Sequence, residues 1–280
     1  MNPSAEYTPQ DVLAVVKDEL ELAVEHYSAA EYPRAVLLAG QPGAGKTELS
    51  SMLLPTLGNN AVLINGDEYR RYHPSYRRLY RMYGAESVSM TAAFSGEVTE
   101  KLIDVLSDRR LHLIIEGTGR TADVPKKTAE HLTDKGYPVI MAVIAVKPEV
   151  SLASTLLRFY EMNERGTLPR ATAVEAHDVV VASLPGNLDK LAPVSAISGM
   201  GIWTRTQEKI FDSETAVDPP SVVLRQFWSR PWTMEERHRI RADIRLLFEK
   251  EERQRLGQGD VIHELERRVN RAIASEEMKL

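Results

Sequence analysis

The sequence predicts an α/β fold, with a doubly wound parallel sheet flanked by helices and a helical extension at the C-terminus. Short apolar runs of strand length alternate with longer segments of helical periodicity, which is the pattern of parallel βαβ units. A glycine-rich segment follows the first apolar run, as in phosphate-binding α/β folds. The 280 residues, with 43% hydrophobic content, are also enough to bury a sizeable core.

The glycine-rich segment reads GQPGAGKT and fits the pattern G-x-x-x-x-G-K-[ST] at every fixed position. A strand-like run precedes it and a helix-like run follows, which is the context that a P-loop requires and which disfavours a plain turn with a surface lysine. Backbone N–H groups of the loop and of the helix start would surround nucleotide phosphates. Lys46 would reach the β- and γ-phosphates, and the Thr47 hydroxyl would ligate Mg²⁺. The predicted nucleotide-binding residues of this P-loop NTPase or kinase-like fold are Gly40, Gln41, Pro42, Gly43, Ala44, Gly45, Lys46 and Thr47.

Apolar runs predict the buried strands of the sheet; they span residues 35–39, 61–65, 111–115 and 138–146, with 196–204 as a candidate fifth. The second run leads into Asp67 and the third into Glu116. The carboxyl ends of parallel strands meet at one edge of a sheet, and ligands bind there. We therefore expect both carboxylates to lie at the same edge as the P-loop.

The chain divides into three predicted regions. Residues 1–33 hold an amphipathic helix that packs on the core, with Thr8 as its N-cap. Residues 34–212 form the P-loop domain. Residues 213–280 form a mostly helical extension, because their apolar residues recur at helical spacing between many charges.

Two stretches late in the chain carry weaker signals. Thr172 and Glu175 predict a capping box that opens a helix, and Pro185 with Gly186 predicts where that helix ends. Residues 222–228 predict a further strand or a short helix.

Composition narrows the functional classes. The net charge is −5 and the pI about 5.9, so nucleic acid is not the expected main partner. The absence of cysteine excludes disulfides, thiol nucleophiles and cysteine-ligated metals. We find no signal-peptide pattern and no apolar run long enough to span a bilayer, so we expect a soluble cytoplasmic protein without a membrane partner.

One stretch departs from this acidic character. Residues 70–83 interleave arginines with tyrosines. Such a stretch could grip single-stranded nucleic acid, close as a lid over an anionic small molecule, or form a solvated helix face. A lid or a solvated helix face is favoured over nucleic-acid binding, because no other basic tract in the sequence extends this basic stretch.

A P-loop alone does not define the reaction. The N-K-x-D motif of GTPases is absent, and the third strand ends in Glu-Gly where ring and motor ATPases carry Asp-Glu. Small-molecule kinases place a carboxylate at the end of the strand neighbouring the P-loop strand, where it takes a proton from the acceptor hydroxyl. Asp67 fits this role, although coordination of Mg²⁺ through water remains the alternative. Arg158, on a helix, and Arg170, in the next loop, are similar to the lid arginines of small kinases, and their alternative is a plain surface position.

Several separated motifs, taken in order, resemble the zeta toxin family. They are GQPGAGKT at 40–47, NGDEY at 65–69 with His73-Pro74, EGTGR at 116–120, STLLR at 154–158, PRAT at 169–172, His177-Asp178 and LPGNL at 184–188. The resemblance covers residues 34–203. Zeta toxins are cytoplasmic bacterial toxins that use ATP and Mg²⁺ to phosphorylate the 3′-hydroxyl of the sugar of UDP-N-acetylglucosamine. This reaction blocks the synthesis of cell-wall precursors, and an epsilon antitoxin neutralises the toxin by covering the nucleotide site.

The resemblance implies roles for individual residues. Asp67 would be the general base, while Lys46, Arg158 and Arg170 would stabilise charge on the transferred phosphoryl group. The implied contacts to the UDP-sugar are Glu100, Glu116, Thr118, Arg120 and Thr128. Two other classes remain open: a kinase of another hydroxyl, such as that of a nucleotide or a polynucleotide 5′-end, and a non-catalytic module that binds nucleotide.

Overall fold

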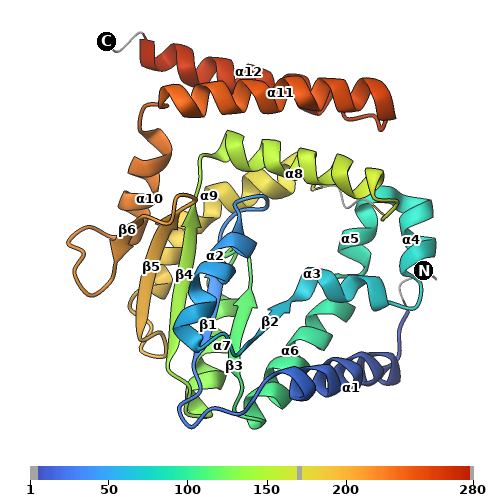
Figure 1. The fold of residues 1–280 in the computed structure, drawn as a ribbon, viewed down its shortest axis with the longest axis vertical. Coiled ribbons are helices and arrows are strands. Elements are labelled where there is room, and N and C mark those ends of the chain that lie inside the picture. The colour runs from blue at the N-terminus through green and yellow to red at the C-terminus, as the bar shows by residue number, and fades with distance from the viewer. Residues whose placement is uncertain (1–5, 169–171, 278–280) are drawn as a thin grey trace.

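The computed structural model describes residues 6–168 and 172–277. Its centre is a six-stranded sheet with the order β2-β3-β1-β4-β5-β6 (Figure 1). Strands β1 to β5 run parallel, and β6 pairs antiparallel with β5. The strands are β1 (Ala35–Ala39), β2 (Ala61–Asn65), β3 (His112–Glu116), β4 (Val139–Ala145), β5 (Gly199–Thr204) and β6 (Lys209–Asp212). The predicted α/β fold with a mostly parallel sheet is confirmed, and β6 is an addition that the sequence did not predict.

The strand order corrects one expectation about Asp67. Strand β3 lies between β1 and β2, and Glu116 at its end is in register with Leu38 of β1 and with Asn65 of β2. The strand that ends in Asp67 is therefore not the neighbour of the P-loop strand. Strand β3 comes after β1 and β2 in the sequence but lies between them in the sheet. Glu116, at the end of β3, is therefore the carboxylate next to the P-loop.

Alternate residues of the buried strands face two different layers. One face packs on α2 (Lys46–Leu53), through Val36 and Leu38 of β1. The other face, through Leu37 of β1 and Leu113 of β3, belongs to the largest core cluster. The helices that supply buried residues to this cluster are α1 (Pro9–His26), α3 (Gly66–Tyr69), α6 (Ala92–Asp108), α7 (Asp123–Asp134), α9 (Val174–Leu191) and α10 (Pro220–Ser229).

The N-terminal helix α1 begins as the sequence predicts. The Thr8 hydroxyl accepts a hydrogen bond from the Asp11 N–H at 3.2 Å, and the Asp11 carboxylate accepts one from the Thr8 N–H at 2.7 Å. This capping box satisfies backbone donors that have no partner within the helix.

Helix α9 does not follow the predicted capping box and end. It begins at Val174, with Ala173 as its N-cap and no side-chain cap, and it continues through Pro185 to Leu191. A proline inside a helix costs about 3 kcal/mol. Burial offsets that cost here, because Leu184, Leu188 and Leu191 are fully buried in the main core. The alternatives for residues 222–228 resolve to helix α10.

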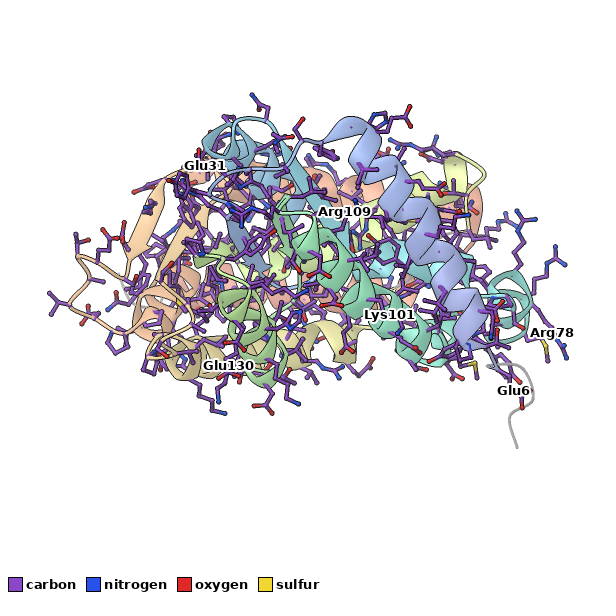
Figure 2. All side chains as sticks on the ribbon, turned by 90° about the horizontal axis from the view of Figure 1, so that it is seen from below. Glu6, Glu31, Arg78, Lys101, Arg109 and Glu130 are labelled. Carbon is purple, nitrogen blue, oxygen red and sulfur yellow. The ribbon has the colours of Figure 1, made fainter. Side chains whose placement is uncertain are left out.

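The arginine-tyrosine stretch folds into short helical pieces beyond β2. They are α3 (Gly66–Tyr69), η2 (Arg70–Tyr72), α4 (Tyr76–Tyr83), η3 (Gly84–Glu86) and α5 (Ser87–Met90). Leu79 of α4 is fully buried, whereas Arg77, Arg78 and Arg81 are exposed. Figure 2 shows Arg78 extending away from the body of the protein.

The C-terminal region forms a hairpin of α11 (Met234–Gln254) and α12 (Gly259–Glu277) that packs on α8 (Pro148–Glu164) (Figure 1). Leu156 of α8, Leu247 of α11 and Leu265 of α12 belong to a second core cluster. None of the helices in the described parts of the chain combines the length and apolar content that a bilayer crossing requires.

A chain of polar contacts also joins the hairpin to α9 and α8. The Arg268 guanidinium donates to both Asp178 carboxylate oxygens at 3.0 and 2.9 Å, and Asp178 contacts the His177 ring at 3.1 Å. The other ring nitrogen of His177 lies 2.8 Å from the Ser151 hydroxyl on α8. The hairpin therefore holds the helix that carries Arg158.

Candidate active site

The carboxyl edge of the sheet gathers the chemically important residues. The P-loop follows β1, Asp67 follows β2, Glu116 ends β3, and α8 with Arg158 follows β4. In open α/β sheets this edge is the ligand-binding edge. The P-loop, Asp67 and Glu116 therefore lie at one edge of the sheet, as the strand pattern predicts.

The P-loop requires glycine at position 43. Gly43 has a φ of +76°, in the left-handed region, and a Cβ atom built there would lie 2.1 Å from the Ser151 carbonyl oxygen of α8. A contact below 3.0 Å forces the backbone to move. The backbone of α8 therefore forms the outer wall of the P-loop.

Gly43→Ala is expected to lower the free energy of unfolding by about 1–3 kcal/mol through backbone strain and to weaken nucleotide binding, because the loop must move away from Ser151. Urea unfolding and nucleotide titration measure the two effects. Gly58→Ala is the matched control, since Gly58 has a φ of +65° but open space around the missing Cβ. Equal behaviour of the two variants would show that the close approach to Ser151 does not matter.

Lys46 lies at the start of α2, and its ammonium donates to the Gly40 carbonyl at 3.2 Å. Burial lowers the pKa of Lys46, and the nearby charges of Glu116 and Asp67 oppose this effect. Thr47, the next residue, is exposed in the first turn of α2. Its side chain is thus available to a metal ion that arrives with a nucleotide, which suits Mg²⁺ because this ion is usually shared between one or two protein oxygens, phosphates and water.

Glu116, at the end of β3, has one oxygen that is buried. Its Oε1 atom makes no hydrogen bond among the described residues. Burial raises the pKa of Glu116, the Lys46 charge opposes that rise, and Asp67 adds to it. An unpartnered buried carboxylate oxygen is costly, so it indicates a hydrogen-bond donor supplied by a ligand.

Asp67 presents its carboxylate toward solvent at the same edge. Its side chain is 64% exposed, and its backbone N–H is held by the Asn65 side chain at 3.0 Å. The Arg70 side chain donates to the Asp67 carboxylate at 2.9 Å and to the Val88 carbonyl at 2.7 Å. Arg70 therefore orients Asp67 while tied to α5. This role of Arg70 was not predicted from the sequence, although a spacing of three residues on a helix is a usable signal for such a pair.

Arg158 is exposed on α8, close enough to influence the pKa of Lys46 and of Glu116 by its charge. The charges of Asp67 and Arg158 thus both lie within electrostatic range of Lys46 and of Glu116. Arg170 lies outside the described residues.

The predicted substrate contacts fall in three places. Thr118 and Arg120 lie in the loop after β3, where the Asn187 side chain holds the Gly119 and Arg120 carbonyls at 2.9 and 2.8 Å. Glu100 is exposed on α6. Thr99, the residue before Glu100, lies next to Gly66, and Gly66 directly precedes Asp67.

Thr128 lies on α7, and its hydroxyl donates to the Val124 carbonyl at 3.0 Å within that helix. Among the described residues, no hydrogen bond or ion pair joins Glu100 or Thr128 to Lys46, Asp67, Glu116 or Arg158.

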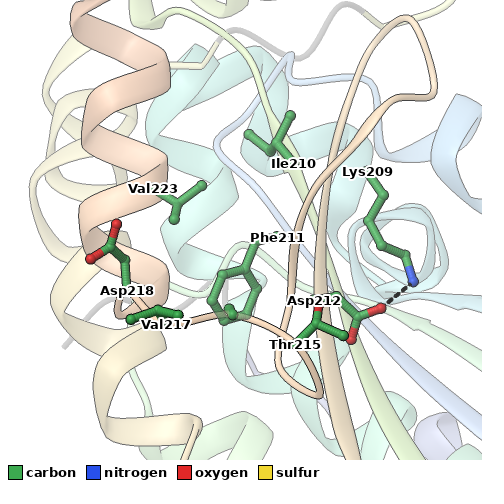
Figure 3. Close-up of a pocket in the computed structure, with 9 residues that line it drawn as sticks. Lys209, Ile210, Phe211, Asp212, Thr215, Val217, Asp218 and Val223 are labelled. Atoms are coloured by element: carbon green, nitrogen blue, oxygen red, sulfur yellow. Dashed lines mark hydrogen bonds and ion pairs between the residues drawn. The ribbon is translucent and has the colours of Figure 1, made fainter.

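A pocket of about 280 Å³ lies away from this site, at the β6 edge of the sheet (Figure 3). Phe211 of β6 and Val223 of α10 line it, and a Lys209–Asp212 ion pair of 2.8 Å borders it. None of the predicted site residues contributes to its lining.

A mostly parallel sheet with a P-loop after its first strand, and with lysine, arginine and carboxylates at its carboxyl edge, defines a protein of the P-loop kinase fold. Residues 17–216 match the Zeta toxin family. The chain belongs to this family.

Similar proteins agree with this membership. Toxin PezT of Streptococcus pneumoniae is 36% identical over 245 residues, which cover 87% of this chain and 97% of PezT. Toxin zeta of Streptococcus pyogenes is 37% identical over 217 residues, covering 77% of this chain and 76% of that toxin. A solved structure from the PezAT chromosomal toxin-antitoxin system of Streptococcus pneumoniae superposes with a TM-score of 0.78 at 33% identity, covering 89% of this chain and 98% of that one.

Proposed function

We propose that this protein is a toxin kinase that transfers the γ-phosphate of ATP to the 3′-hydroxyl of the sugar of UDP-N-acetylglucosamine, or of a related UDP-amino sugar, and so inhibits the synthesis of cell-wall precursors. Membership of the Zeta toxin family supports the toxin role. The observation that carries the kinase role is the exposed Asp67 carboxylate, within electrostatic range of the P-loop lysine.

In the proposed reaction, Asp67 accepts the proton of the acceptor hydroxyl as the hydroxyl oxygen attacks the γ-phosphorus. The new oxygen–phosphorus bond forms while the bond from that phosphorus to the β-phosphate oxygen breaks, and ADP leaves. Lys46, Arg158 and Arg170 stabilise the negative charge on the transferring group. Mg²⁺, held in part by Thr47, would neutralise charge on the phosphates.

The buried Glu116 oxygen supports an acceptor molecule that carries a hydroxyl or amide donor besides the reacting hydroxyl. This unpartnered Oε1 can accept a hydrogen bond from such a group, next to the P-loop and one strand from Asp67. Thr118 and Arg120 in the adjoining loop, Glu100 on α6 and Thr128 on α7 are the other proposed contacts to the UDP-sugar.

The proposed macromolecular partner is an epsilon-type antitoxin that covers the nucleotide site. The similar solved structure supports an antitoxin partner, because it comes from the PezAT toxin-antitoxin system.

Incubation with ATP, Mg²⁺ and a mixture of UDP-sugars tests the proposal. Mass spectrometry should find one added phosphoryl group on UDP-N-acetylglucosamine or a related UDP-amino sugar, and a Lys46→Met control should give none. The competing acceptor is a 5′-hydroxyl polynucleotide, favoured by the exposed arginines of α4. Phosphate found only on such an oligonucleotide would replace the proposed acceptor, and no transfer to either would favour a nucleotide-binding module.

A further inference from the structure

Arg205 directly follows β5 and is distant from the P-loop in the sequence, yet its side chain contacts backbone carbonyls of that loop. Its Nε donates to the Ala44 carbonyl at 2.9 Å, and its Nη2 donates to the Gly43 carbonyl. The same Nη2 lies 3.0 Å from the Ser154 hydroxyl of α8. One guanidinium thus ties the loop, the end of β5 and α8 together.

We propose that Arg205 is a positioning residue for nucleotide binding: it holds the Gly43 and Ala44 carbonyls outward, so that the loop keeps its N–H groups turned toward the phosphates. The proposal rests on the nucleotide-binding part of the proposed function and is independent of the acceptor.

Peptide geometry explains the effect. The C=O and N–H groups of a trans peptide point in opposite directions, so a guanidinium that holds the Ala44 carbonyl on the outside directs the Gly45 N–H to the inside. The Ala44 N–H already bonds the Gln41 carbonyl at 3.0 Å within the turn. The Ala44–Gly45 peptide is therefore the unit that Arg205 controls.

The loop needs this restraint because its glycines allow the peptides to rotate. Gly43 and Gly45 have φ values of +76° and +101°, and glycine enters and leaves such conformations at little steric cost. Two carbonyls held by one rigid, planar group lose that freedom together. A lysine in this place could hold only one of them well, because its ammonium lacks the forked geometry.

The surroundings of Arg205 fit a structural cation. The side chain is half-buried, and burial lowers its pKa. The charge of Arg239 on α11 adds to this effect, whereas Glu48 of α2 and Asp243 of α11 oppose it. Arginine keeps its charge under such conditions. The contribution of Asp243 also means that the C-terminal hairpin reaches the environment of the P-loop.

Arg205→Met and Arg205→Lys test the proposal, with Arg241→Met on the exposed side of α11 as the control. Titration with a non-hydrolysable ATP analogue should show a dissociation constant raised about 10- to 100-fold for Arg205→Met, in line with the loss of charged hydrogen bonds, and an intermediate rise for Arg205→Lys. KM for ATP should rise in parallel, whereas KM for the acceptor should stay within about twofold of the unaltered protein. The control should match the unaltered protein.

Unchanged nucleotide affinity in both Arg205 variants would overturn the proposal. So would an equal rise of both KM values together with a lower melting temperature in Arg205→Lys, since that pattern indicates a general disturbance of the active site and not a specific loss of nucleotide positioning. The two proposals fail in different ways. A protein that binds the ATP analogue but does not phosphorylate UDP-sugars leaves the Arg205 test valid, and an active protein whose Arg205 variants bind nucleotide normally refutes only the role of Arg205.

Discussion

Asp67→Asn is expected to reduce kcat for phosphoryl transfer by about 10²- to 10⁴-fold, because the amide cannot accept the proton of the attacking hydroxyl. Asparagine has nearly the same size and keeps a hydrogen-bonding oxygen that Arg70 can still contact. KM for ATP and the melting temperature should therefore change little. Steady-state kinetics and thermal unfolding measure these quantities.

Glu68→Gln, at the neighbouring position of α3, is the control for a general loss of charge. Glu68 forms an ion pair of 3.9 Å with Arg71. If Asp67→Asn kept the activity of the unaltered protein, another residue would have to be the base. Glu116, next to the P-loop, would then be the first to test.

Arg158→Ala is expected to lower kcat by about 10³-fold, the effect typical of an arginine that stabilises charge on a transferring phosphoryl group. The affinity for nucleotide should fall far less, since the charge develops mainly in the transition state. Arg158 is exposed on α8, so its removal opens no cavity. Single-turnover kinetics separate the transfer step from binding.

Arg245→Ala, an exposed arginine of α11, provides the matched control and should retain full activity. If kcat fell by less than about tenfold in Arg158→Ala, Arg158 would have no role in stabilising the transferring phosphoryl group, and other cations would have to do so.

Much of the fold follows from local sequence patterns. The apolar runs of β1 and β2 are short, continuous and bounded by turn residues, so their limits could be predicted from the sequence. The P-loop carries its own motif. The positions of Asp67 and Glu116 at one edge follow because parallel strands place their carboxyl ends together.

The order of the strands could not be predicted in the same way. A buried strand has the same apolar pattern whichever strands lie beside it, so nothing in 111–115 indicates that β3 separates β1 from β2. The continuation of α9 through Pro185 likewise depends on tertiary burial, which overrides the local signal.

Two site residues make contacts that no sequence motif indicates. Arg205 is 161 positions from Ala44, which its guanidinium contacts. Arg70 belongs to a stretch whose arginines and tyrosines fit a nucleic-acid grip, a lid or a solvated helix face. Its pairing with Asp67 distinguishes it from Arg77 and Arg78, which are exposed on α4.

A crystal structure of the Asp67→Asn protein with a non-hydrolysable ATP analogue and UDP-N-acetylglucosamine tests the central claim most directly. The account predicts that the 3′-oxygen of the sugar lies about 2.6–3.2 Å from the side chain at position 67 and in line with the bond from the γ-phosphorus to the leaving oxygen. A sugar bound with that oxygen out of reach of position 67, even through one water molecule, would contradict the account.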